Sequence, residues 1–202
     1  MTSQLQSIEF TPLERINIVL SNVIKMLISR KLLDPTAYIK EQDYNNTLDK
    51  LDISTYKFEN IIDKSQIIVK IMQQKITSVS KNVSLLEFLS KYDEAHKILI
   101  ALDISPKTQR QIIAKSRNTE IFLESELMMN IIDYIHVPKH ELLNDKEKEA
   151  FLASYDCKKK LIPRMFAGDP ISRYYRAKVG DIFRITRPSE TTCFSITYRI
   201  VV

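Results

Sequence analysis

Glycine is almost absent from this sequence: its 202 residues include only two, Gly168 and Gly180. A glycine-rich phosphate-binding loop is therefore excluded, because such loops need several glycines where the backbone approaches the phosphate. Tryptophan is lacking altogether, and there are only two cysteines, Cys157 and Cys193, well separated along the chain. Two separated cysteines do not make a disulfide framework, and they favour a reducing compartment.

Long apolar runs are also missing. No run approaches the about 20 residues that a membrane-spanning helix needs, and the N-terminus begins with polar residues. Hydrophobic residues make up 44% and charged residues 27% of the chain, which is typical of a folded globular protein. We therefore expect a soluble, intracellular protein of one or two domains.

The net charge of +5 is unevenly distributed. From Lys158 to Val202 ten basic residues stand against three acidic ones, a net charge of +7, so the rest of the chain carries −2. A basic C-terminal segment can bind nucleic acid or the acidic surface of a protein partner. It can equally be a solvated face without a partner.

Residues 1–135 show a succession of helix and strand patterns. Thr11-Pro12-Leu13-Glu14 is a capping box with proline at the first helical position, and apolar residues at helical spacing follow to about Leu33. Further on the patterns predict strands at 66–72, 98–102, 120–123 and 129–135, and helices at 84–94 and 105–115. Alternating strands and helices predict an α/β layer, whereas residues 36–64 are mixed and suggest no function.

The C-terminal part is predicted to be a small helix packed on a β-hairpin. Asp169-Pro170 is a helix start, and Gly180 suits a chain reversal. A strand from Asp181 to Arg187 and a turn at 188–192 precede a segment in which Phe194, Ile196, Tyr198 and Ile200 alternate with polar residues. Pro138 interrupts the preceding pattern, so we predict an α+β protein with domains at 1–135 and 136–202.

Short fragments of this C-terminal part, in their order and spacing, resemble a known family. They are Val137-Pro138-Lys139-His140, Ile162-Pro163-Arg164, Asp169-Pro170, Gly180, Arg187-Pro188-Ser189-Glu190-Thr191 and Tyr198-Arg199. Together they resemble the C-terminal assembly domain of the fifth common subunit of eukaryotic RNA polymerases, a family that also has archaeal members. The resemblance implies that residues 1–135 form an α/β jaw domain, as in the eukaryotic type, and that residues 136–202 form a small mixed α/β assembly domain.

The resemblance implies a non-catalytic subunit of a DNA-directed RNA polymerase, with no cofactor of its own. The assembly domain would bind the largest subunit and neighbouring small subunits. The positions that the resemblance assigns to this interface are Pro163, Arg164, Asp169, Pro170, Arg173, Tyr174, Arg187, Ser189, Glu190, Thr191, Tyr198 and Arg199. The alternative is a free-standing basic transcription factor that binds nucleic acid.

One turn of the jaw domain approaches downstream DNA in that family, and the matching residues here are Ser105, Pro106, Lys107 and Thr108. The Lys107 ammonium and the two hydroxyls can reach phosphate oxygens, which would be a weak contact independent of base sequence. Alternatively, Ser105-Pro106 only caps a helix. The same sequence fits both interpretations, because helix caps and phosphate contacts use the same groups.

We predict neither an active site nor a metal site. His136 and His140 are four residues apart, but Pro138 breaks the helix that would align them, and no Cys-x-x-Cys pair accompanies them. Asp156-Cys157-Lys158 matches half of a restriction-nuclease signature in spelling only, which leaves a nuclease as a third and weaker alternative.

Two positions depart from the family pattern. Cellular members carry glycine where this chain has Arg176, and again in the turn where it has Thr192-Cys193, so we expect both turns to differ in shape. The divergent sequence, rich in Ile, Lys and Asn, favours a large DNA virus that encodes its own polymerase. The chain would then act in a cytoplasmic viral factory or the virion, and in the nucleus if it is cellular.

Overall fold

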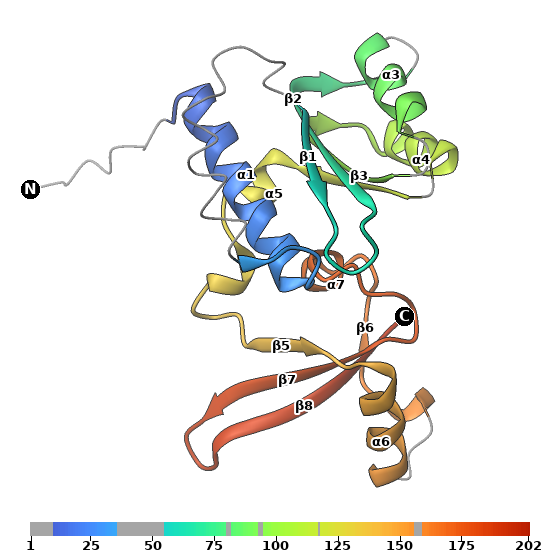
Figure 1. The fold of residues 1–202 in the computed structure, drawn as a ribbon. Helices are drawn as coiled ribbons and strands as arrows, with labels where there is room; N and C mark the ends of the chain where they lie inside the picture. The colour runs from blue at the N-terminus through green and yellow to red at the C-terminus, as the bar shows by residue number, and fades with distance from the viewer. Residues whose placement is uncertain (1–9, 36–54, 80–81, 93–94, 117, 156–158) are drawn as a thin grey trace, which may run out of the picture. The chain divides into compact units, whose positions relative to one another are not determined.

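The computed structural model describes residues 10–35, 55–79, 82–92, 95–116, 118–155 and 159–202. The chain divides into two compact units, Met1–Met129 and Asn130–Val202, and each carries a four-stranded sheet (Figure 1). The predicted mixed α+β class, with an α/β region before a C-terminal α+β domain, is therefore confirmed.

Unit 1 is built on a sheet with the strand order β1-β2-β3-β4. Its strands are β1 (Thr55–Glu59), β2 (Gln66–Ile76), β3 (His96–Ile104) and β4 (Thr119–Leu123). β1 runs antiparallel to β2, whereas β2, β3 and β4 are parallel neighbours. Parallel strands need a long crossover, and here the helices α3 (Val83–Lys91) and α4 (Pro106–Lys115) provide it.

Helices cover both faces of this sheet. α3 and α4 lie on one face, and α1 (Pro12–Ser29) and α5 (Glu124–Leu127) lie on the other (Figure 1). β3 is central, and its residues from His96 to Ala101 are all buried. The strand predicted at 98–102 is confirmed, and it is buried as far as Ala101 because a strand between two helical layers has no solvent side, whereas Leu102 is exposed.

The start of α1 follows the predicted capping box. The Glu14 backbone N–H donates to Thr11 Oγ1 (3.3 Å), and the Thr11 N–H donates to Glu14 Oε2 (2.7 Å). The helix ends at Ser29, earlier than predicted, since Lys31 adopts a left-handed backbone with φ of 61° and the Leu32 N–H donates to Leu27 O.

Unit 2 contains a sheet with the order β5-β7-β8-β6. Its elements are η1 (Ile131–Asp133), β5 (Lys139–Leu142), α6 (Asp145–Tyr155), η2 (Lys159–Leu161), β6 (Arg164–Met165), α7 (Pro170–Tyr174), β7 (Ile182–Ser189) and β8 (Cys193–Val201). β7 and β8 form the predicted hairpin, and the Asp169 carboxylate caps α7 by accepting from the Ile171 N–H (2.9 Å).

Each face of this second sheet has its own apolar cluster. On one face Leu143, Ile162, Ile182 and Ile200 pack with residues of α6. The opposite face carries a cluster around Phe183 and Ile185 with Ile171 of α7. Because adjacent residues of a strand point to opposite faces, Ile182 packs in the first cluster and Phe183 in the second.

Two sequence predictions of secondary structure need correction. The strand expected at 129–135 is absent; Ile131–Asp133 is a short 3-10 helix, in which the Asp133 N–H donates to Asn130 O (3.1 Å). The segment contains apolar residues, but no sheet partner lies beside it among the described residues. Conversely, β1 occupies part of the segment 36–64 for which no structure was predicted, and residues 36–54 lie outside the description.

The turns that depart from the family pattern keep a backbone conformation that glycine favours. Arg176 has φ of 53° and Cys193 has φ of 61°, both left-handed, and Gly180 has φ of 95°. The expected difference in shape from the turns of cellular members stays a prediction. The predicted domain limits, 1–135 and 136–202, stay a prediction about independent folding.

Candidate functional site

The most distinctive surface of unit 2 is a hollow of about 350 Å³, which we name the basic hollow. It is lined by Ile131, His136, Val137, Pro138, His140, Met165, Asp169, Pro170, Ile171, Ile185, Arg187 and Arg199. Four of the residues predicted for the subunit interface are thus brought together here from three separate elements: Asp169, Pro170, Arg187 and Arg199. Both histidines line it as well, although Pro138 lies between them.

The register of the hairpin places the two arginines on one face of the sheet. Arg199 is paired with Phe183, and Arg187 is paired with Ser195. Residues directly opposite in an antiparallel pair point the same way, and Phe183 and Arg187 are four residues apart on one strand. Both guanidinium groups are exposed, and neither forms a hydrogen bond or an ion pair with any residue that the structure describes.

His140 forms part of the wall between these charges. Its Nδ1 lies 2.6 Å from Pro138 O, and its ring meets Phe183 edge-on with centroids 6.1 Å apart. Burial lowers the pKa of His140, and the positive charges of Arg199 and Arg187 lower it further. The hydrogen bond to Pro138 and the charge of Asp169 act in the opposite direction without reversing the shift.

Tyr175 supports the hollow from behind. Its hydroxyl donates to His140 O (3.0 Å), and its ring packs at 5.7 Å from that of Phe183. Burial raises the pKa of Tyr175 to about 12, with smaller contributions from Tyr174 and Glu141. This phenol therefore stays protonated in the physiological range and can donate the hydrogen bond that links the segment after α7 to β5.

The other residues predicted for the interface are spread over unit 2. Pro163 precedes β6, and its carbonyl oxygen accepts from the Ile200 N–H (2.8 Å), whereas Arg164 is the first residue of β6 and Arg173 lies in α7. Tyr174 is buried and meets Tyr175 edge-on at 5.4 Å.

The hairpin turn holds three more of them. Ser189 Oγ lies 3.3 Å from Thr191 Oγ1, and Glu190 is exposed between them. In the described chain no ion pair joins Glu190 to either arginine of the basic hollow. Glu190 therefore belongs to the tip of the hairpin rather than to the hollow.

Apolar side chains remain exposed on the other face of the hairpin. Phe194 is 68% and Ile196 56% exposed, and Pro188 is paired with Phe194. Farther along the same face Tyr198 packs on Phe151 with ring centroids 4.2 Å apart. The alternating pattern predicted one apolar face correctly, but it could not show that α6 covers only part of it.

In unit 1 the predicted DNA-contacting turn is the N-terminal cap of α4. Ser105 Oγ accepts from the Thr108 N–H (3.3 Å), and the Thr108 hydroxyl donates to Thr77 O (2.9 Å). Thr108 is only 2% exposed, so its hydroxyl already serves the fold. Pro106 and Lys107 are exposed, and Lys107 is the member of the turn that can reach a phosphate.

The sequence also contains a signal in α4 that the turn alone does not reveal. The helix holds three cations, Lys107, Arg110 and Lys115, and no carboxylate. All three are exposed, and none has an ion pair among the described residues. Counting charges along the whole helix, rather than in its first turn, would have found Arg110 and Lys115.

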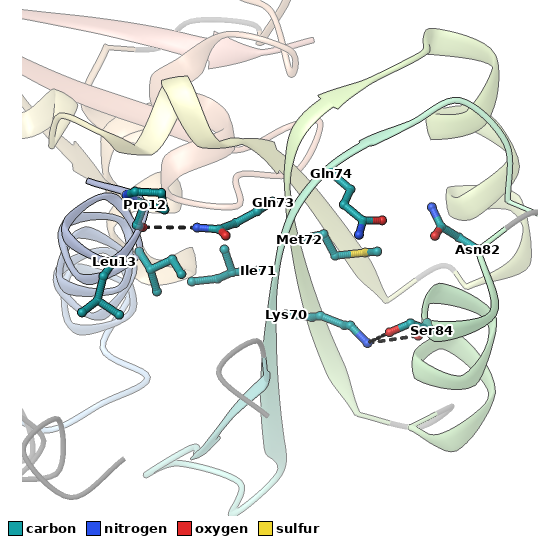
Figure 2. Close-up of a pocket in the computed structure, with 10 residues that line it drawn as sticks. Pro12, Leu13, Lys70, Ile71, Met72, Gln73, Gln74, Asn82 and Ser84 are labelled. Atoms are coloured by element: carbon teal, nitrogen blue, oxygen red, sulfur yellow. Dashed lines mark hydrogen bonds between the residues drawn. The ribbon is translucent and has the colours of Figure 1, made fainter. Parts of the chain in front are cut away.

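A second hollow, of about 470 Å³, lies in unit 1 between the start of α1, β2 and the start of α3 (Figure 2). Gln73 Nε2 donates to Pro12 O (3.2 Å), and Lys70 Nζ donates to Ser84 Oγ (2.6 Å). Lys70 is thus occupied in fixing α3. None of the predicted site residues lines this hollow.

Comparison with known proteins shows the family of this chain. The family model described as RNA polymerase Rpb5, C-terminal domain, matches residues 129–201. The subunit 5 of the DNA-directed RNA polymerase of Acanthamoeba polyphaga mimivirus is 31% identical over 199 residues, which cover 94% of this chain and 93% of that protein. The chain belongs to the RNA polymerase Rpb5 family.

The extent of similarity differs among members of the Rpb5 family. The subunit rpabc1 of RNA polymerases I, II and III of Dictyostelium discoideum is 30% identical over 189 residues, covering 89% of this chain and 93% of that protein. The subunit Rpo5 of Methanocaldococcus jannaschii is 39% identical over 74 residues, which are 37% of this chain but 95% of that protein. The similarity therefore spans nearly the whole archaeal protein but little more than a third of this chain.

This Rpb5-family chain is a subunit of a DNA-directed RNA polymerase and part of that multisubunit complex. The predicted family is confirmed, and a viral relative exists. In the parts of the chain that the structure covers, we find no helix with the length and apolar character to cross a bilayer.

Proposed function

We propose that unit 2 attaches this subunit to the largest subunit of the polymerase and to neighbouring small subunits, without taking part in catalysis. The observation that carries the proposal is the pair of unpaired guanidinium groups of Arg187 and Arg199 at one hollow. Charges without partners are costly to place in a dry interface unless the partner supplies the opposite charge. On the reverse face the exposed Phe194 and Ile196 offer an apolar contact.

We further propose that unit 1 stands beside downstream DNA with α4 towards the duplex. Lys107, Arg110 and Lys115 give this helix three free positive charges. Such charges make sequence-independent contacts with phosphates. The net charge of −2 on residues 1–157 means that these contacts act within the complex, where other subunits hold the DNA.

The subunit acts wherever the two large polymerase subunits assemble. For a cellular polymerase that place is the nucleus, and for a viral polymerase it is the cytoplasmic viral factory or the virion. The rival function is a free-standing basic factor that binds nucleic acid. Such a factor would co-purify with nucleic acid and without the two large polymerase subunits.

The test is recovery of polymerase on the affinity-tagged full chain. We expect two very large chains in equal amounts with the tagged protein. Glu190→Lys and Phe194→Asp, each shown to be folded by circular dichroism, should lower the recovery. Glu149→Lys is the control of equal charge change for Glu190→Lys, since Glu149 is exposed and lies outside the hairpin. Recovery of nucleic acid without the large chains would instead support the free-standing factor.

A further inference from the structure

We infer that the basic hollow receives an acidic side chain, an aspartate or a glutamate, of the polymerase subunit that covers this face of unit 2. The inference rests on the proposed function, because it names the chemistry of the contact that unit 2 makes on assembly. It concerns the hollow defined above and the residues Arg187, Arg199, His140 and Asp169.

The charges of the hollow do not balance. Arg187 and Arg199 contribute two positive charges, and Asp169 is the only carboxylate in the lining. Asp169 Oδ1 already accepts from the Ile171 N–H (2.9 Å) at the start of α7. A second carboxylate from outside would complete the neutralisation. The planar guanidinium group binds carboxylates with two parallel hydrogen bonds, which makes arginine well suited to such a contact.

The walls of the hollow favour a side chain over a nucleic acid. Five of the lining residues are aliphatic or sulfur-containing, namely Ile131, Val137, Met165, Ile171 and Ile185. A volume of about 350 Å³ holds one or two side chains. A phosphate backbone, in contrast, needs an extended basic track, and here it would pass the Asp169 carboxylate. Once a partner covers the hollow, the apolar walls would keep water away from the contact, which strengthens the attraction between opposite charges.

His140 provides a separate signature of the bound carboxylate. The groups that act on its ring are Arg187 of β7, Arg199 of β8, the cap residue Asp169, and Pro138 O, with Phe183 packed against it. A new negative charge would offset the two arginines and raise the pKa of His140 from its lowered value. Assembly would then take up a proton, so the complex should tighten as the pH falls through the range in which His140 titrates.

The decisive experiment is zero-length cross-linking of the polymerase recovered on the tagged full chain. The variants Arg199→Lys and Arg187→Lys keep the positive charge and add a primary amine. A carbodiimide activates a carboxylate, and attack by the amine forms an amide bond and releases the activated oxygen as a urea. We expect the introduced lysine to be joined to an aspartate or glutamate of another polymerase subunit, identified by mass spectrometry.

Lys178 is the matched control, since it is a native, exposed lysine of unit 2 outside the hollow. Cross-links from Lys178 but none from either introduced lysine, in polymerase that is fully recovered, would overturn the inference. If the wild-type chain recovers no polymerase at all, the proposed function itself fails, and that outcome is separate from failure of the inference.

A charge-reversal variant gives an independent arm. The double variant Arg187→Glu/Arg199→Glu should recover roughly tenfold less polymerase or worse, because like charges would then meet in the hollow. The double variant Lys159→Glu/Lys160→Glu alters the net charge equally and should recover normal amounts. Normal recovery on the arginine variant, with loss of duplex DNA binding by the isolated chain, would assign the hollow to phosphate and overturn the inference.

Discussion

Arg30 at the end of α1 and Glu120 in β4 form a two-pronged ion pair inside unit 1. Arg30 Nη1 lies 2.9 Å from Glu120 Oε1, and Nη2 lies 2.7 Å from Oε2. His96 Nε2, at the start of β3, approaches Oε1 to 2.6 Å. The three side chains are largely buried, so this contact joins the end of the first helix to the central strand β3 and the edge strand β4.

Removal of the carboxylate should destabilise unit 1. In the Glu120→Gln variant Arg30 and His96 lose the negative charge that lies between them, and breaking a buried pair in this way typically costs about 3–5 kcal/mol. Urea denaturation followed by circular dichroism measures the free energy of unfolding. Lys75→Ala is the control, because it removes the exposed pair with Asp103 and should change stability little. Equal losses in the two variants would contradict a special role for Glu120.

The same pair predicts how stability depends on acid. Burial disfavours the charged carboxylate, but the hydrogen bond with His96 and the charge of Arg30 prevail and lower the pKa of Glu120 to about 2. A carboxyl group with a lowered pKa in the folded state stabilises the fold above its ordinary value of 4.5, and that stability is lost as the pH falls from there towards 2. The shift corresponds to about 3 kcal/mol.

We therefore expect the difference in unfolding free energy between wild type and Glu120→Gln to shrink steadily between pH 4.5 and 2. Chemical denaturation at a series of pH values in this range measures it. A difference that stays constant would show that the ionised carboxylate does not supply the stability.

A single substitution in the hairpin turn should stabilise unit 2. Cys193 is exposed and has φ of 61°, a conformation that costs a residue with a side chain about 1–2 kcal/mol. Glycine removes this cost but loses about 0.5–1 kcal/mol of chain entropy, so the expected net gain for Cys193→Gly is up to about 1 kcal/mol. Thermal melts measure the effect. Cys193→Ala keeps the Cβ and should show no gain; equal gains in both variants would refute the backbone explanation.

The division of the chain can be tested with two fragments. A fragment of residues 130–202 should fold alone and melt cooperatively, since it contains both apolar clusters of unit 2. A fragment of residues 136–202 lacks Ile131, which packs against the cluster around Phe183, and should melt at a lower temperature. Equal melting temperatures would favour the limit at 135, and a disordered 130–202 fragment would reject an independent domain.

The contribution of α4 to DNA retention should appear in its salt dependence. Each phosphate contact releases one condensed counterion, so Lys107→Ala and Arg110→Ala should each reduce the slope of log affinity against log salt by roughly one unit in the assembled polymerase. The reduction should be the same on unrelated DNA sequences. Lys64→Ala, an exposed lysine outside α4, is the control. Unchanged slopes in both α4 variants would show that this helix does not contact the DNA phosphates.

Several local features of this protein were determined by the sequence alone. The capping box at Thr11, the cap at Asp169 and the hairpin of β7 and β8 all formed as predicted. Each depends on interactions between residues a few positions apart, and such interactions can be read from spacing. The order of short fragments between Val137 and Arg199 likewise sufficed for the family.

The tertiary structure decided what those patterns left open. The apolar residues of 129–135 became a 3-10 helix, because a strand needs a neighbour and the sheet offered none there. The Thr108 hydroxyl was predicted to reach phosphate. In the structure Thr108 is buried, and its hydroxyl donates to the backbone oxygen of Thr77, 31 residues away. Arg187, Arg199, His140 and Asp169 meet at one hollow only through strand register and the packing of α7. Contacts between distant residues depend on how the elements pack, and local spacing carries no information about that.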